Sequence, residues 1–114
     1  MHTKQIDRVV DPITQSEKEL PADYNPPARL AIAFRELNRL DDAKLAIDRA
    51  LRKCTEGPRK LRLYEIKADI LSKSGDADGR IKTLHEAIRW AEQLPKGQQV
   101  PRKLAALKAS IEAK

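Results

Sequence analysis

The residues best suited to chemistry are few and widely spaced in this chain of 114 residues. The two histidines, His2 and His85, and the single cysteine, Cys54, stand far apart, so they do not have the spacing of metal ligands. No glycine-rich phosphate loop of the GxxxxGK[ST] or GxGxxG type is present. The serines, such as Ser72 and Ser110, have no base nearby in the sequence. We therefore predict no catalytic residue, no metal site, no cofactor and no enzymatic activity.

Charged side chains instead gather on one face of a predicted helix over residues 61–71, LRLYEIKADIL. At about 100° per residue, this helix has two apolar stripes on nearly opposite sides. The first stripe contains Leu61, Tyr64, Ala68 and Leu71, the second contains Leu63, Ile66 and Ile70, and the remaining polar sector contains Arg62, Glu65, Asp69, Ser72 and Lys73. A surface helix needs only one apolar stripe. We therefore expect an interior helix with neighbours on both flanks and a polar face open to solvent or to a partner.

The composition favours an all-helical protein. Charged residues make up 35% of the chain and aromatic residues 4%, and no segment has the alternation and β-branched content of a strand. No run approaches the roughly 18 apolar residues of a membrane span, and the first residues do not resemble a signal peptide. Together with the lone cysteine, these features predict a cytoplasmic protein that does not use a membrane.

The net charge of +6 and the pI near 9.6 raise the alternative of an anionic partner such as a nucleic acid. Lysine and arginine are, however, interspersed with acidic residues along most of the chain, and no aromatic platform lies on a basic face. We therefore favour a protein or peptide partner and keep a small basic helical nucleic-acid-binding protein as the alternative.

Prolines and glycines divide the chain into an N-terminal arm, residues 1–25, and a helical domain, residues 26–114. Four of the seven prolines fall within residues 1–27, so we expect an extended or weakly ordered arm. Five helices should follow, over about 26–38, 41–56, 58–73, 76–94 and 100–113. The short connections make successive helices antiparallel neighbours. The expected fold is two helical hairpins followed by a C-terminal capping helix, with Trp90 either covering that helix or open to a partner.

An internal repeat of 37 positions relates the two predicted hairpins. It pairs Ala31 with Ala68, Phe34 with Leu71, Asp41 with Asp78, Ile47 with Leu84, Ala50 with Ala87 and Leu51 with Ile88. Small residues recur where helices approach closely, and large residues recur where they fill the layer between helices. This pattern resembles the tetratricopeptide repeat, although Arg80 stands where that family usually has alanine. The alternative is an ordinary five-helix bundle in which the alanine spacing is a coincidence.

The resemblance implies a right-handed stack of hairpins whose first helices line a concave peptide-binding groove. At the matching positions, the groove residues would be Ala28, Ile32, Arg35 and Glu36, followed by Arg62, Glu65, Asp69 and Lys73. The implied function is that of a protein–protein interaction module, either an adaptor or a chaperone-like peptide binder. About three repeats are usually needed for stability, so the C-terminal helix, the arm or a second subunit must cover the outer faces. A homodimer therefore stays open, and the arm from Ile6 to Leu20 is a candidate occupant of the groove.

Overall fold

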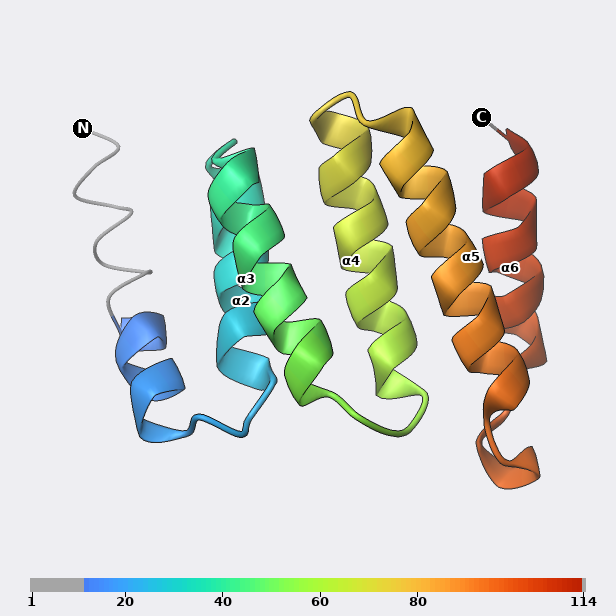
Figure 1. The fold of residues 1–114 in the computed structure, drawn as a ribbon, viewed down its shortest axis with the longest axis horizontal. Coiled ribbons are helices and arrows are strands. Elements are labelled where there is room, and N and C mark those ends of the chain that lie inside the picture. The colour runs from blue at the N-terminus through green and yellow to red at the C-terminus, as the bar shows by residue number, and fades with distance from the viewer. Residues whose placement is uncertain (1–11, 114) are drawn as a thin grey trace. The chain divides into compact units, whose positions relative to one another are not determined.

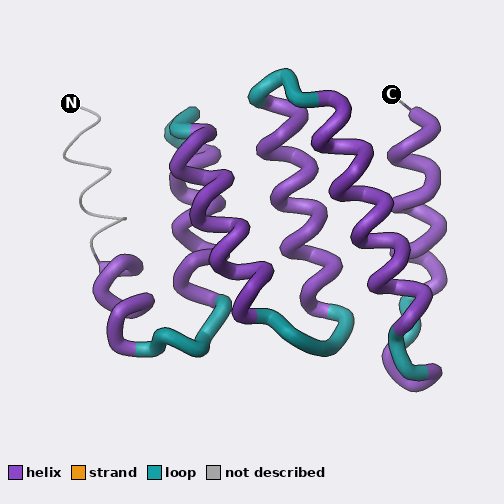
Figure 2. The backbone as a smooth tube through the Cα atoms, in the orientation of Figure 1, coloured by secondary structure: helices purple, strands orange, loops and turns teal. Residues whose placement is uncertain are grey.

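The computed structural model describes residues 12–113, in which helices are joined by turns and no strand occurs (Figures 1 and 2). The five predicted helices are α2 (Asn25–Glu36), α3 (Leu40–Lys53), α4 (Arg59–Lys73), α5 (Ala77–Gln93) and α6 (Pro101–Ala113). A short 3₁₀ turn, η1 (Lys96–Gln98), links α5 to α6. The predicted all-α class and hairpin organisation are confirmed, with helix ends within a few residues of those expected.

Residues 12–19 are helical as well, where the sequence had predicted an irregular arm. The Glu17 carboxylate accepts hydrogen bonds from Arg49 Nε (2.8 Å) and Lys53 Nζ (3.1 Å), both on α3. These contacts attach the short helix to a neighbour that lies more than 30 positions away, which explains why local sequence signals missed it. Residues 1–11 of the predicted arm, including Ile6, lie outside the described residues, and residues 20–24 connect the short helix to α2.

The chain divides into two compact units, residues 1–54 and 55–114. The division therefore follows Cys54, whereas the predicted domain boundary followed residue 25. In the first unit, α2 packs against α3. Small buried residues, mainly alanines, make up much of this contact. The buried side chains of the hairpin include Leu30, Ala31, Ala43, Ala46, Ile47 and Ala50.

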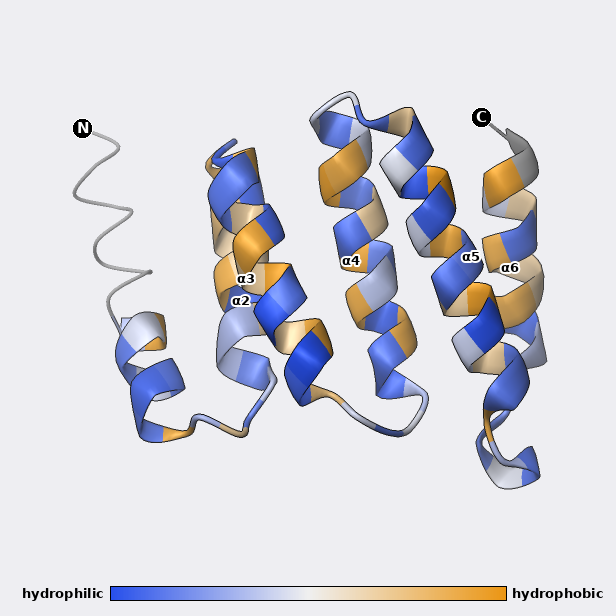
Figure 3. Ribbon diagram, in the orientation of Figure 1, coloured by the Kyte–Doolittle hydropathy of each residue, from blue (hydrophilic) through white to orange (hydrophobic). Residues whose placement is uncertain are grey.

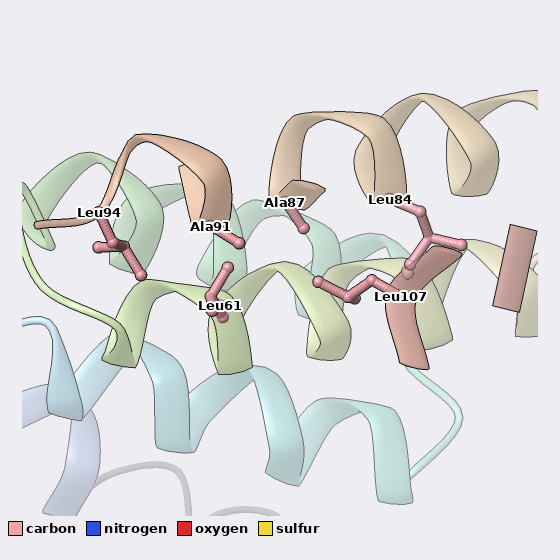
Figure 4. Packing of buried hydrophobic residues seen from close by; sticks show 7 residues of the cluster. Leu61, Leu84, Ala87, Ala91, Leu94 and Leu107 are labelled. Atoms are coloured by element: carbon pink, nitrogen blue, oxygen red, sulfur yellow. The ribbon is translucent and has the colours of Figure 1, made fainter. Parts of the chain in front are cut away.

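In the second unit, α4 packs against α5 and α5 packs against α6. One hydrophobic cluster joins the three helices and contains Leu61, Ala68, Leu84, Ala87, Ala91, Leu94 and Leu107. Figure 4 shows Leu61 of α4 directed towards Ala91 of α5, with Leu107 of α6 beside Leu84. Leu63, Ile66 and Ile70, the second apolar stripe of α4, are also buried. Both stripes predicted for this helix are therefore withdrawn from solvent.

The helix ends follow the 37-position repeat. The last residues of α2 and α4, Glu36 and Lys73, are 37 positions apart, and so are the first residues of α3 and α5, Leu40 and Ala77. Each first helix is closed by a residue with positive φ, Asn38 at 60° and Gly75 at 81°. In the second copy, the Asp76 N–H donates to the Leu71 carbonyl (2.9 Å), and the first copy has the equivalent bond from Arg39 to Phe34 (2.8 Å). These are paired Schellman turns.

Hydrophilic positions occur along every helix of the described chain (Figure 3). Within residues 12–113, no helix combines the length and the apolar character that crossing a membrane requires.

Candidate functional site

The second unit contains a hollow of about 350 Å³ between α4 and α6, with α5 as its floor. We call it the C-terminal hollow, because it lies towards the C-terminal end of α6. Its lining residues are Glu65, Ala68, Asp69 and Ser72 of α4, Arg80 and Leu84 of α5, and Ala106, Leu107 and Ser110 of α6. Two helices form its walls and a third closes it from below, so the hollow can enclose a bound chain segment on three sides.

A second hollow of about 650 Å³ lies beside the beginning of α6, and we call it the N-terminal hollow. Its lining residues are Glu65, Gln99, Val100, Pro101, Arg102, Lys103 and Ala106. Valine, proline and alanine supply apolar surface, and the two basic residues supply positive charge. This combination suits a ligand that carries an apolar group next to an anionic one.

The two hollows share Glu65 and Ala106, so they adjoin along α6. We refer to them together as the α4–α6 groove. Lys103 Nζ donates a hydrogen bond of 2.7 Å to Glu65 Oε1, and this ion pair connects the two walls where the hollows meet. From Pro101 to Ser110 the groove follows about 14 Å of helix, which matches about four residues of extended chain.

Arg80 fixes one end of the groove. Its Nη2 atom donates to the Ser110 backbone carbonyl (2.8 Å) and to the Ser110 hydroxyl (2.9 Å). These two hydrogen bonds join α5 to the C-terminal part of α6. The arginine that departs from the usual tetratricopeptide alanine therefore anchors α6 to α5.

Four of the predicted groove residues lie on α4. Glu65 and Asp69 line the C-terminal hollow, whereas Arg62 and Lys73 are exposed and do not line it. Two of the four predicted α4 residues therefore lie on this hollow, and their role in binding a partner stays a prediction.

The other four predicted groove residues lie on α2, in the first unit. Ala28 is buried, Ile32 and Arg35 are half-buried, and Glu36 is exposed. Arg35 Nη2 lies 3.3 Å from Glu36 Oε1. Because the α2 and α4 residues belong to different units, a groove that combines them stays a prediction.

None of the groove residues predicted from the sequence lies on α5 or α6. Lys103, Ala106 and Ser110 have helical spacing and lie next to the apolar stripe that includes Leu104 and Leu107. That stripe faces the core, because Leu107 is buried and Leu104 packs against the cluster. On a helical wheel of α6, the sector next to this apolar stripe contains Lys103, Ala106 and Ser110. That sector could have predicted the second wall of the groove.

Trp90 lies outside the groove. Its ring is half-buried against the hydrophobic cluster, and its indole N–H donates to the Gly57 carbonyl (2.9 Å). The Lys60 ammonium lies 4.5 Å from the centre of the ring. Covering of the C-terminal helix and binding of a partner both stay predictions for Trp90, whose contacts hold the turn before α4 against α5.

Positive charge is concentrated in the second unit. Residues 55–114 contain 13 basic and 8 acidic residues, a net charge of +5 out of the total of +6. Within residues 12–113, no three His, Cys, Asp or Glu side chains come together as a metal site would require. Comparison with known proteins finds no match to a protein-family model, a curated protein or a solved structure.

Proposed function

We propose that this protein is a protein–protein interaction module, an adaptor or chaperone-like binder, that holds a short extended peptide in the α4–α6 groove. The observation that carries the proposal is the groove itself, which has two helical walls, a floor and a polar rim. Its length of about 14 Å limits the segment to about four residues in direct contact. A partner would therefore be recognised by a short motif.

The helical repeat supports this proposal. The resemblance to tetratricopeptide repeats predicts that first helices line the ligand surface, and α4 is the first helix of the second hairpin. On this basis α6 takes the place of a further first helix and provides the opposite wall. A cytoplasmic location belongs to the same proposal.

Selection of peptides on the purified full chain tests the proposed function. Peptides enriched from a displayed random library would be synthesised and titrated into labelled protein, and backbone amide shifts would be followed by NMR. We expect the largest shifts at Glu65, Ser72 and Ser110, and small shifts at Lys44 on α3. Failure to enrich any peptide, or shifts that avoid α4 and α6, would reject the groove as the binding surface.

A nucleic-acid-binding function remains the alternative, because the net charge of +5 falls within residues 55–114. A protein that neutralises phosphates loses affinity steeply as salt rises. Titration of generic single-stranded and double-stranded DNA and RNA at low and high salt separates the two functions. Absence of binding at low salt removes the alternative, whereas tight and steeply salt-dependent binding would favour it over the peptide groove.

A further inference from the structure

The ion pair between Glu65 and Lys103 lies where the two hollows of the α4–α6 groove meet. Both side chains keep about two fifths of their surface exposed, at 39% and 40%. Exposed ion pairs are weak because water and salt screen them. A carboxylate brought by a ligand can therefore replace Glu65 on Lys103 at little cost to the fold.

Arg102 adds positive charge beside this pair. It lines the N-terminal hollow and is exposed, and the described residues provide no hydrogen-bond or ion-pair partner for its guanidinium. The first turn of α6 contains no acidic residue. Glu65, already paired with Lys103, is the single acidic residue that lines this hollow. The N-terminal hollow therefore has one guanidinium available to a ligand anion and one ammonium that an internal carboxylate occupies.

The same hollow provides an apolar surface from Val100, Pro101 and Ala106. Its volume of about 650 Å³ is ample for a large aliphatic side chain. An apolar anchor with an adjacent carboxylate would fill both parts of the hollow at once. Such a combination, a central anchor with a charged rim, is typical of small binding hot spots.

We propose that the N-terminal hollow binds an acidic peptide segment with an apolar anchor, and that Glu65 competes with the ligand's carboxylate for Lys103. This inference rests on the proposed function, because it specifies the ligand of the same groove. Binding exchanges one Lys103–carboxylate pair for another and adds a pair with Arg102. Glu65 therefore lowers the affinity for acidic ligands and excludes weakly acidic ones.

The groove favours an acidic peptide over a polynucleotide. A nucleic-acid backbone carries a charge on every phosphate, and its path along the groove would pass Glu65 and Asp69 in the C-terminal hollow. Like charges facing each other in an interface oppose binding. A peptide, in contrast, can place its carboxylates beside Lys103 and Arg102 and a neutral segment beside Asp69.

Two fluorescent peptide pools test the proposal on the purified full chain. Both pools carry a central leucine; glutamate flanks it in one pool and glutamine in the other. By fluorescence polarisation, we expect the glutamate pool to bind about tenfold more tightly at low salt, and the difference to shrink at high salt. Glu65→Gln should tighten binding of the glutamate pool by about threefold and leave the glutamine pool unchanged.

Variants of the basic residues complete the test. Lys103→Gln and Arg102→Gln should each reduce the preference for glutamate, whereas Lys103→Arg should keep it because the charge is retained. Glu92→Gln and Lys108→Gln are the matched controls. They alter an ion pair between α5 and α6 at 3.8 Å that lines neither hollow, so they should leave the preference unchanged. Circular dichroism checks that each variant is folded.

The outcomes separate this inference from the proposed function. If both pools bind equally and NMR places them in the groove, the charge assignment is overturned and the peptide-binding function stands. If Glu65→Gln weakens binding of the glutamate pool, Glu65 is not a competitor and the inference is overturned. If neither pool binds while unbiased selection yields a groove-bound peptide, the ligand class is wrong. If selection also yields nothing, the proposed function fails with it.

Discussion

Arg80 on α5 donates two hydrogen bonds to Ser110 on α6, at 2.8 Å to its carbonyl and 2.9 Å to its hydroxyl. Arg80→Ala should lower the free energy of unfolding by about 1.5–3 kcal/mol, since a charged donor is lost from a helix end. Ser110→Ala removes only the hydroxyl acceptor and should cost about 1 kcal/mol. Urea unfolding of the variants measures both effects. Equal stability of Arg80→Ala and the parent protein would show that the contact does not hold α6.

Glu17 should make the stability of the first unit dependent on acid pH. The hydrogen bond from Arg49 is the largest cause that holds the pKa of its carboxyl below the ordinary glutamate value. Burial, the next largest, opposes this, and the hydrogen bond from Lys53 adds to the lowering. A depressed folded pKa contributes stability that is present above the unfolded pKa, about 4.3, and is lost as pH falls through the folded value. Unfolding measured at neutral and at acid pH should therefore show this loss in the parent protein.

Glu17→Gln should remove that part of the pH dependence and destabilise the protein at neutral pH by about 1–2 kcal/mol. Glu19→Gln is the matched control, because it removes the same charge from the same short helix. Glu19 is exposed, and among the described residues its carboxylate accepts a hydrogen bond from Gln15, at 3.1 Å. An equal effect of the two substitutions would show that the contact with α3 is not what anchors residues 12–19.

Local signals in the sequence predicted the hairpins well, because each helix carries its own start and stop residues. Gly75 and Pro58 lie close to observed helix boundaries, and the apolar stripes of α4 are buried as expected. The helix over residues 12–19 depends instead on pairing of Glu17 with Arg49 and Lys53. No local pattern contains that information.

The candidate site also combines a part that local sequence patterns predict and a part that depends on tertiary packing. The polar sector of α4 can be found on a helical wheel, and two of its residues, Glu65 and Asp69, line the C-terminal hollow. The opposite wall depends on which face of α6 turns towards α4, and that is set by the burial of Leu107 and by the contact from Arg80. Arg80 had been noted only as a departure from the repeat pattern. At this position, which faces α6, the residue that departs from the repeat pattern makes a tertiary contact.

Gly75 provides a test of the paired turns. Its φ of 81° is one that L side chains rarely adopt, and a Cβ there would meet no atom within 4 Å. Gly75→Ala should therefore cost about 1–2 kcal/mol through backbone strain alone. Gly97→Ala, at a glycine without positive φ and also in open space, is the control and should be neutral or slightly stabilising.

At the equivalent turn of the first hairpin, substitution should not lower the stability. Asn38 adopts φ of 60° at the position 37 residues before Gly75. Asn38→Gly relieves the steric cost of the left-handed conformation, so we expect unchanged or slightly higher stability, by up to about 1 kcal/mol. A marked loss of stability in this variant would indicate that the asparagine side chain, and not the backbone turn, closes α2.

Substitution of Leu107 tests whether the packing of α6 stabilises the second unit. It is the one α6 residue within the hydrophobic cluster, at 2% exposure. Leu107→Ala should lower the free energy of unfolding by about 2–5 kcal/mol, because truncation leaves a cavity against Leu84 and its neighbours. Leu45→Ala on α3 is the matched control, since Leu45 is 62% exposed and should change stability by less than about 0.5 kcal/mol.

Removal of residues 98–114 extends the same argument. It strips α6 from the cluster and uncovers Leu84, beside which Leu107 packs. We expect the shortened chain to aggregate or to lose cooperative unfolding, because newly exposed apolar surface promotes association. Analytical ultracentrifugation and dye binding to exposed apolar surface measure this. A shortened chain that stays monomeric and unfolds at the parent's urea midpoint would show that α6 does not cover the core, and the groove would then lose its second wall.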